Sequence, residues 1–316
     1  MRPGVLVISH GSREAQWVQL VDDAVNSASS RVRWRPEGIQ GRQQAEGSGA
    51  AWEALSPARA AGEKRLELSV ARGGQAVPVI SSFLEIVGGR LIQDGIDQLE
   101  AEGVTHIYVL PLFVSSGSTH VDDIAQAFGL PPVSSRRPGE LARFRWKEET
   151  RIRFGLPIDD DPQIAGMLLA NIRGLSEAPE RERLLLVAHG SREAVFHGRW
   201  RSGLQQLLQR LLQLGGFAGG DTAMLLPNQA ACRLGAMRRK EPQQAVIVVP
   251  LFLSEGYFTR TVIPSRLGDL AYRYNGRALL PSPGIAGWME EQINGWLAGF
   301  GENAPAVRDS DPQRFV

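Results

Sequence analysis

Short apolar runs alternate with amphipathic stretches of helical length along most of the chain. The apolar runs, such as residues 5–8 and 246–249, are rich in Val, Ile and Leu and are followed by Gly, Ser or Pro. Runs that are apolar throughout are typical of parallel strands covered on both faces, and the helical stretches between them predict crossover connections. The clearest predicted helices are residues 16–28, 89–102 and 203–214. The pattern therefore predicts an α/β fold with doubly wound parallel sheets.

The chain also repeats itself. Residues 5–14 read VLVISHGSRE and residues 184–193 read LLLVAHGSRE. Further along, residues 107–117 read IYVLPLFVSSG and residues 246–256 read VIVVPLFLSEG. A weaker third pair joins residues 154–172 with residues 279–296. Because the matched blocks keep the same order, we expect two similar doubly wound domains that arose from an internal duplication.

The spacing of the repeats locates an insertion in the first half. His189 follows His10 by 179 residues, whereas Pro250 follows Pro111 by 139, so the first half carries roughly forty extra residues. They fall between Arg31 and Gln75, in a stretch without a strand pattern in which residues 51–70 could form an amphipathic helix. The predicted organisation is an N-terminal repeat at 1–178 with an insertion at about 31–75, a C-terminal repeat at 183–300, and a tail at 301–316.

The composition of the chain argues against several kinds of binding partner and metal site. With 35 basic and 34 acidic residues, the net charge of +1 gives no overall attraction to nucleic acid or to an anionic membrane. No segment approaches the roughly 18 to 20 apolar residues that span a bilayer, and the apolar run after Met1 is too short for a signal-peptide core. The single cysteine, Cys232, excludes an internal disulfide and a thiolate metal cluster. We therefore predict a cytoplasmic protein that binds neither nucleic acid nor membrane.

Two histidines stand where ligands bind in such folds. His10 follows the first apolar strand in a glycine turn, and His120 lies just beyond the strand that contains Pro111. Ligands of doubly wound folds sit at the carboxyl ends of the strands, so both imidazoles are expected at one edge of the sheet. A pair of neutral imidazoles there is a plausible ligand set for Co2+, Ni2+, Fe2+ or Zn2+. Asp122 and Asp123, in the first turn of the helix after His120, are interpreted as helix-capping residues.

Glu85 is the third candidate. It lies in the apolar stretch 79–87 (VISSFLEIV), where a carboxylate is unusual unless it has a partner. Near a metal-binding histidine pair it could complete the ligand set or accept a proton. Helix capping and simple surface exposure are equally compatible with the pattern.

The HGSR turn, the FLE segment, the PLF strand followed by a glycine loop and a histidine, and the duplication together resemble the ATP-independent class II chelatases of the sirohydrochlorin cobaltochelatase type. The resemblance covers nearly the whole chain apart from the insertion and the last residues. It implies insertion of a divalent metal, Co2+ in the first place with Fe2+ or Ni2+ possible, into sirohydrochlorin on the route to cobalamin or sirohaem. It places the metal-binding and catalytic roles on His10, His120 and Glu85, and implies no cofactor beyond the metal.

The substrate of this family is a carboxylate-rich tetrapyrrole, which arginines at the rim could anchor. The candidates near the motifs are Arg13, Arg192, Arg260 and Arg266, each of which could equally be a solvated surface residue. Substrate contacts are also expected from Ser12, Arg13, Ser115 and Ser116. In the second half, aligning PLFLSEGYFT with PLFVSSGSTH puts Thr259 in the place of His120, so His189 has no imidazole partner. We therefore expect one active site, in a monomer with pseudo-twofold symmetry.

Two other functions compete with this interpretation. A carrier of metal or tetrapyrrole would use the same residues without turnover. Histidine phosphatases also place a His-Gly pair after a first strand, but they need an arginine directly before the histidine, and here Ser9 and Ala188 occupy those positions. No phosphate-binding loop of the GxxxxGK[ST] type is present, so a nucleotide-driven mechanism has no support.

Overall fold

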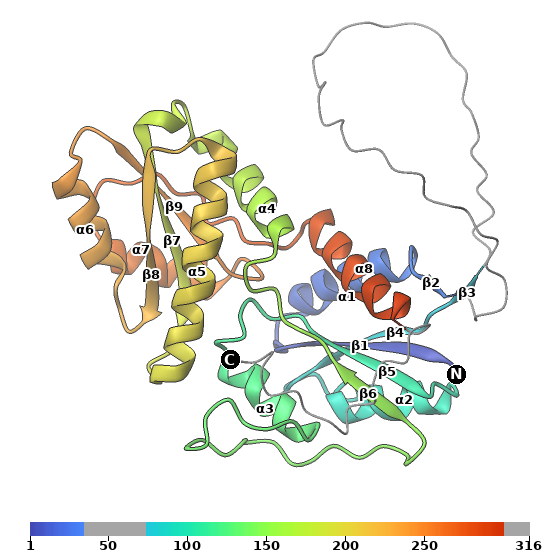
Figure 1. Ribbon diagram of the computed structural model, residues 1–316. Helices are drawn as coiled ribbons and strands as arrows, with labels where there is room; N and C mark the ends of the chain where they lie inside the picture. The colour runs from blue at the N-terminus through green and yellow to red at the C-terminus, as the bar shows by residue number, and fades with distance from the viewer. Residues whose placement is uncertain (35–73, 300–316) are drawn as a thin grey trace, which may run out of the picture.

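The computed structural model describes residues 1–34 and 74–299, and it contains two parallel sheets flanked by helices (Figure 1). The first sheet has the order β4-β1-β5-β6 and the second has the order β8-β7-β9, with every neighbouring pair parallel. The strands of the two sheets are β1 (Pro3–Ser9), β4 (Val79–Phe83), β5 (His106–Pro111) and β6 (Arg151–Phe154), then β7 (Glu182–Gly190), β8 (Gly219–Leu226) and β9 (Ala245–Leu251). A short antiparallel ribbon is formed by β2 (Arg33–Trp34) and β3 (Gln75–Ala76). The predicted fold class is confirmed.

Helices connect the strands and cover the faces of both sheets (Figure 1). They are α1 (Ala15–Ser29), α2 (Ile92–Ala101), α3 (Thr119–Ala127), α4 (Pro162–Ile172), α5 (Ala194–Gly215), α6 (Ala230–Lys240), α7 (Ile263–Leu267) and α8 (Pro283–Ala298). Three single turns complete the set: the 3-10 turns η1 (Arg173–Leu175) and η2 (Pro179–Arg181), and the π-helical turn η3 (Phe258–Val262). Every residue of β1 is buried, as its apolar sequence predicts.

The predicted helices agree with the structure in position and differ at their ends. The stretch 16–28 matches α1, whereas α2 begins only at Ile92 because the chain first passes through a glycine loop. Helix α5 begins nine residues before the predicted start at residue 203. Trp200 and Phe196 are buried one and two turns before Leu204, so they extend the apolar stripe of this helix toward its N-terminus.

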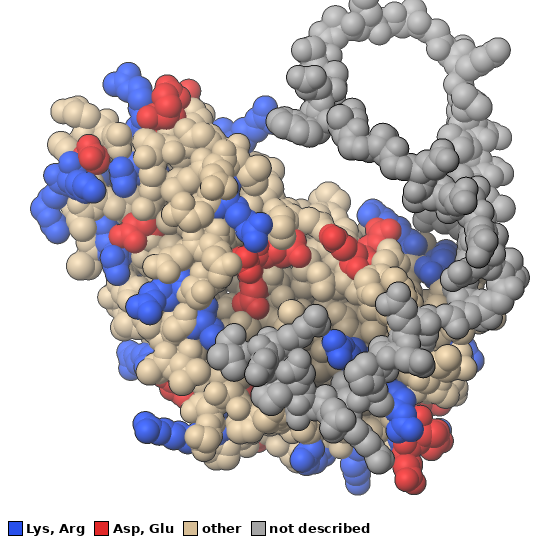
Figure 2. Space-filling model, viewed as in Figure 1, with Lys and Arg blue, Asp and Glu red and all other residues tan. Residues whose placement is uncertain are grey.

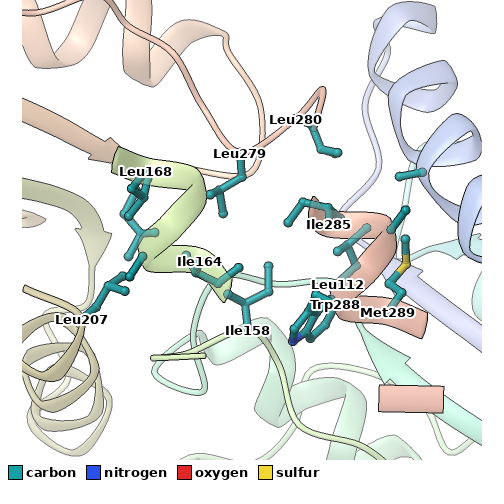
Figure 3. Close-up of a cluster of buried hydrophobic side chains, with 14 of the residues drawn as sticks. Leu112, Ile158, Ile164, Leu168, Leu207, Leu279, Leu280, Ile285, Trp288 and Met289 are labelled. Carbon is teal, nitrogen blue, oxygen red and sulfur yellow. The ribbon is translucent and has the colours of Figure 1, made fainter. Parts of the chain in front are cut away.

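The last helix of each half packs against the other half. Helix α4 lies against α5 of the second half, while α8 returns to the first half and packs against α1 and β5. The ring of Trp296 on α8 stacks on Tyr108 of β5 with a centroid distance of 5.2 Å. Figure 3 shows side chains of α4, α5 and α8 meeting in one apolar cluster between the sheets. One hydrophobic core therefore includes residues of both halves. The domain boundary at 178–183, which was drawn from the sequence repeats, stays a prediction.

Several predictions concern residues outside the described ranges. The insertion core, including the predicted helix at 51–70, and the tail at 301–316 fall in residues 35–73 and 300–316. Within residues 1–34 and 74–299, no helix is both long enough and apolar enough to cross a bilayer. On the face shown in Figure 2, basic and acidic side chains are interspersed, in keeping with the net charge of +1.

Candidate functional site

His10 occupies a tight turn at the carboxyl end of β1. Gly11 follows it with φ at +99°, a conformation that side chains rarely adopt. A Cβ atom at Gly11 would lie 2.1 Å from the carbonyl oxygen of Glu85, so the backbone of the two loops is in direct contact. The Glu85 amide donates to the His10 carbonyl at 3.3 Å, and the Leu84 amide donates to the Ser9 carbonyl at 2.8 Å. The turn that carries His10 is thus fastened to the loop that carries Glu85.

Glu85 lies in a loop and not on a strand, because β4 ends at Phe83. The Phe83 amide donates to the Arg90 carbonyl at 2.9 Å and closes the loop at its base. Within this loop, the Val87 amide donates to the Glu85 carbonyl at 2.8 Å across Ile86, whose φ is +74°. This is a γ-turn in its rare, strained form. The Glu85 side chain is 54% exposed, so the structure holds this carboxylate at the surface of the loop.

The Arg90 side chain anchors the Glu85 loop to helix α1. Its guanidinium makes two hydrogen bonds to Asp22 of α1, at 2.9 and 2.6 Å. The same guanidinium lies 4.9 Å from the centre of the Phe83 ring, at the end of β4. A bidentate ion pair on an aromatic face is well suited to hold a strained loop in one conformation. Arg90 was not among the residues singled out in the sequence.

His10 and His120 meet at the carboxyl ends of neighbouring strands. Their ring centres are 4.8 Å apart and the ring planes are inclined by 84°. His10 Nδ1 lies 3.6 Å from Glu85 Oε1 and 3.3 Å from the Gly11 carbonyl oxygen. The structure therefore brings all three predicted site residues together.

Electrostatics favour a neutral His120. Burial lowers the pKa of His120 below its usual 6.5, and the nearby imidazole of His10 lowers it further. The carboxylates of Asp123, Glu85 and Glu140 act in the opposite direction but do not reverse the shift. A His120 with a lowered pKa is unprotonated at neutral pH and has a nitrogen lone pair free to bind a metal ion.

The site offers two imidazoles for a metal, with Glu85 beside one of them. Among the described residues, no group of three His, Cys, Asp or Glu side chains is arranged to hold a metal ion. The assignment of Glu85 as a third metal ligand therefore stays a prediction. Its position next to His10 Nδ1 suits a group that orients this imidazole or takes a proton from it.

The loop that leads to His120 is held by a carboxylate that the sequence reasoning missed. The amide and the hydroxyl of Ser116 donate to Asp159 Oδ1 at 2.7 and 3.1 Å, and the Gly117 amide donates to Ser115 Oγ at 3.0 Å. Burial raises the pKa of Asp159 above its ordinary value. The hydroxyls of Ser115 and Ser116 thus have partners within the protein, and their contact with substrate stays a prediction.

The interpretation of Asp122 and Asp123 as helix caps is wrong. Both side chains are buried, and they bind the segment that follows α3 instead of the amides at its start. Asp122 Oδ1 accepts from the Val133 amide at 2.8 Å, and Asp123 forms a two-point ion pair with Arg137. The cause is tertiary, because the segment after α3 folds back over this helix and provides donors that the sequence spacing does not reveal.

The second half keeps the histidine turn but changes its partner. His189 Nδ1 lies 3.0 Å from the Gly190 carbonyl oxygen, as His10 Nδ1 lies beside Gly11. The Phe258 ring packs edge-on against His189, with a centroid distance of 5.0 Å and an interplanar angle of 86°. Thr259 is fully buried and its hydroxyl bonds to the Gly256 backbone. The expectation that Thr259 replaces His120 is wrong in space, because the chain here forms the π-helical turn η3, and it is Phe258 that faces His189.

The remaining candidates for substrate contact differ in whether they already have a partner within the protein. Arg13 and Arg192 are exposed. Arg260 pairs with Glu255 at 3.1 Å, and Arg266 donates to the Leu225 carbonyl oxygen, so it supports the second half. The Ser12 hydroxyl accepts from the Glu14 amide at 3.0 Å. The role of the four arginines and of Ser12 in binding substrate stays a prediction.

The contact between Gly11 and Glu85 leads to a stability prediction. We expect Gly11→Ala to lower the free energy of unfolding by about 3 kcal/mol, because the added methyl group meets the Glu85 carbonyl and the backbone is left-handed. Gly89→Ala is the matched control: its φ is +73° but nothing lies within 4 Å of the added Cβ, so about 1 to 2 kcal/mol is expected. Urea unfolding of both variants measures the difference. Equal losses would show that the two loops separate at little cost.

The chain matches one protein family in two consecutive segments. The model of the CbiX family matches residues 58–175 and again residues 183–294. The first matched segment contains Glu85 and His120, and the second contains His189 and Phe258. A comparison with curated proteins finds no match.

Solved structures share the fold across nearly the whole chain. One is described as SirB from Bacillus subtilis with Fe3+, with a TM-score of 0.63, 16% identity, and coverage of 96% of this chain and 98% of that one. Another is CbiX, described as the terminal enzyme for biosynthesis of siroheme in denitrifying bacteria, with a TM-score of 0.53, 14% identity, and coverage of 93% and 99%. The protein DR2241 from Deinococcus radiodurans matches with a TM-score of 0.54 and 14% identity, over 92% of this chain and 54% of its own. With two family segments in tandem and the shared chelatase-like fold, the chain belongs to the CbiX family.

Proposed function

We propose that this protein is a metal chelatase that inserts a divalent metal ion into a tetrapyrrole macrocycle. The observation that carries the proposal is the pair of imidazoles, His10 and His120, that separate strand ends bring to a centroid distance of 4.8 Å. Membership of the CbiX family and the fold shared with SirB and CbiX support the same activity. The finer proposal, from the sequence resemblance, is insertion of Co2+ into sirohydrochlorin.

The chemistry assigns a task to each residue of the site. Insertion of a divalent metal displaces two pyrrole protons, so the reaction needs ligands that hold the metal and acceptors for the protons. His120, neutral because burial lowers its pKa, binds the incoming ion together with His10. As the ion passes to the macrocycle, the two released imidazoles accept the two pyrrole protons, and Glu85, 3.6 Å from His10 Nδ1, takes up a proton from His10 or steers its orientation. Exposed arginines such as Arg13 and Arg192 are proposed to hold the carboxylates of the macrocycle.

The ligand set is compatible with several divalent metals. Two imidazoles with a nearby carboxylate accept Co2+, Fe2+ and Ni2+, and selection among them depends on supply as much as on ligands. The SirB structure was described with Fe3+, and CbiX as an enzyme of siroheme biosynthesis, which favours Fe2+ as the main alternative to Co2+. No cofactor besides the metal substrate is proposed.

A direct assay tests the proposal. We expect the protein to accelerate the absorbance change of sirohydrochlorin on addition of Co2+, and the initial rates with Co2+, Fe2+ and Ni2+ rank the metals. The spontaneous reaction without protein is the control for each metal. Binding of metal and macrocycle without any acceleration would leave only the carrier function, since a carrier shares the binding residues but not the turnover.

A further inference from the structure

Arg137 lies at the centre of a cluster of carboxylates next to the helix that carries His120. Its side chain is only 14% exposed. The guanidinium pairs with Asp123 of α3 through both terminal nitrogens, with Nη2 at 3.0 Å from Oδ2. Nη2 also lies 3.0 Å from Glu140, and Nη1 lies 3.9 Å from Asp122. Three carboxylates of the first repeat thus share one arginine.

The same guanidinium reaches the second repeat. Its Nε atom lies 3.5 Å from Glu193 Oε1, and its Cζ atom lies 5.9 Å from the centre of the Phe196 ring. Glu193 is the N-cap residue of α5 and closes the HGSRE turn that begins at His189. Arg137 therefore connects α3 of the first repeat to the start of α5 in the second.

The loop before α3 also packs closely against α5. A Cβ atom added at Gly117 would lie 2.6 Å from Trp200 Cδ1 and 2.8 Å from the Phe196 carbonyl oxygen. Gly117 belongs to the loop that leads into α3, and Phe196 and Trp200 belong to α5. Figure 1 shows the lower end of α5 next to α3. The loop before His120 is therefore packed on the second repeat without room for a side chain.

We propose that Arg137 is a positioning residue through which the second repeat fixes His120 for metal binding. Asp123 lies one turn after His120 on α3, so a guanidinium that ties Asp123 to Glu193 restricts the helix on which His120 stands. Arginine suits this task because its planar fork holds Asp123 with both terminal nitrogens while Nε faces Glu193, a geometry that the single nitrogen of lysine does not reproduce. The second repeat, which lacks the imidazole pair, takes part in the reaction through this contact.

The inference rests on the proposed function and is tested with three variants. Glu193→Gln removes the negative charge that Arg137 faces in the second repeat and leaves the pair with Asp123, and Arg137→Lys weakens both contacts. Arg210→Gln is the matched control, because Arg210 also joins α5 to the first repeat, through Asp160 at 2.9 Å, but does not touch α3. Affinity for Co2+ alone, kcat and KM for sirohydrochlorin insertion, and thermal unfolding are measured for each.

For Glu193→Gln and Arg137→Lys we expect Co2+ affinity and kcat to fall about five- to tenfold, the size of a typical coupling between contacting residues. KM for the macrocycle should stay near the wild-type value, because no substrate contact is removed. The double variant should lose no more than the worse single variant, and Arg210→Gln should retain wild-type affinity and kcat. Glu193 is half exposed, so its variant folds even if Arg137→Lys does not.

Two results would overturn the inference: wild-type Co2+ affinity in Glu193→Gln, or an equal loss in Arg210→Gln. The Co2+ measurement needs no tetrapyrrole, so it decides the role of Arg137 separately from the chelatase activity. A protein that binds Co2+ through the coupled pair but accelerates no insertion would contradict the proposed function and support the positioning role.

Discussion

His10→Ala and His120→Ala are each expected to lower the rate of metal insertion by more than ~100-fold, since loss of a mere supporting contact to a metal ligand already costs 10- to 100-fold. The two imidazoles are the protein's main ligands for the ion, and each variant leaves one of them alone. The measurement is the initial rate of the sirohydrochlorin absorbance change at saturating metal. Co2+ affinity should fall in parallel, because binding and insertion depend on the same pair.

His106→Gln is the control for this experiment. His106 is the first residue of β5, at the opposite end of the strand from the turn that leads to His120, so its loss should leave the insertion rate unchanged. The His10 side chain is 44% exposed, and removing it leaves no buried cavity that would unfold the protein. A His10→Ala variant that inserts metal at the wild-type rate would place the reaction elsewhere and defeat the proposed mechanism.

Phe258→His is expected to create a second metal site in the second repeat. His189 and Phe258 have a centroid distance of 5.0 Å and an angle of 86°, against 4.8 Å and 84° for His10 and His120. The second repeat thus keeps the ring geometry of the pair, with a phenyl ring in place of the second imidazole. Phe258 is 37% exposed, so a polar ring is tolerated at this position. Equilibrium dialysis with Co2+ should show a rise from one bound ion to two.

Thr259→His is the matched control for the engineered site. Thr259 is the residue that a gapless alignment puts opposite His120, but it is fully buried and bonded to the Gly256 backbone. An imidazole there should destabilise the protein and add no ion. The combination of His10→Ala with Phe258→His should retain one bound ion, at the second site. A single bound ion in Phe258→His would show that the likeness of the two ring pairs does not extend to ligand geometry.

Together, these contacts suggest how the two repeats share the work. The first repeat holds the imidazole pair, and the second keeps the turn but has an aromatic ring in place of the second imidazole. The second half still contributes, because α8 packs on the sheet of the first half and Glu193 reaches the cluster around Arg137. We expect neither half to form this site alone.

The fold class and the place of the histidine pair follow from the amino-acid sequence alone. Continuous apolar strands, helical crossovers and repeated motifs in a fixed order indicated duplicated parallel sheets, which the structure and the two CbiX segments confirm. His10 and His120 could be placed together because the carboxyl ends of parallel strands share one edge of a sheet. That rule requires only that the strands are parallel, and continuous apolar runs separated by helical stretches indicate parallel strands.

The surroundings of the pair depend on contacts between elements that only the folded chain brings together. Asp123 binds Arg137 and does not cap its helix, Phe258 rather than Thr259 faces His189, and α4 and α8 pack on the opposite halves. Each of these contacts joins segments that are distant in sequence or depends on a local change in helix type. Hydrophobic periodicity reports which face of an element is buried, but the partner of a buried carboxylate or aromatic ring is fixed only when the elements pack together.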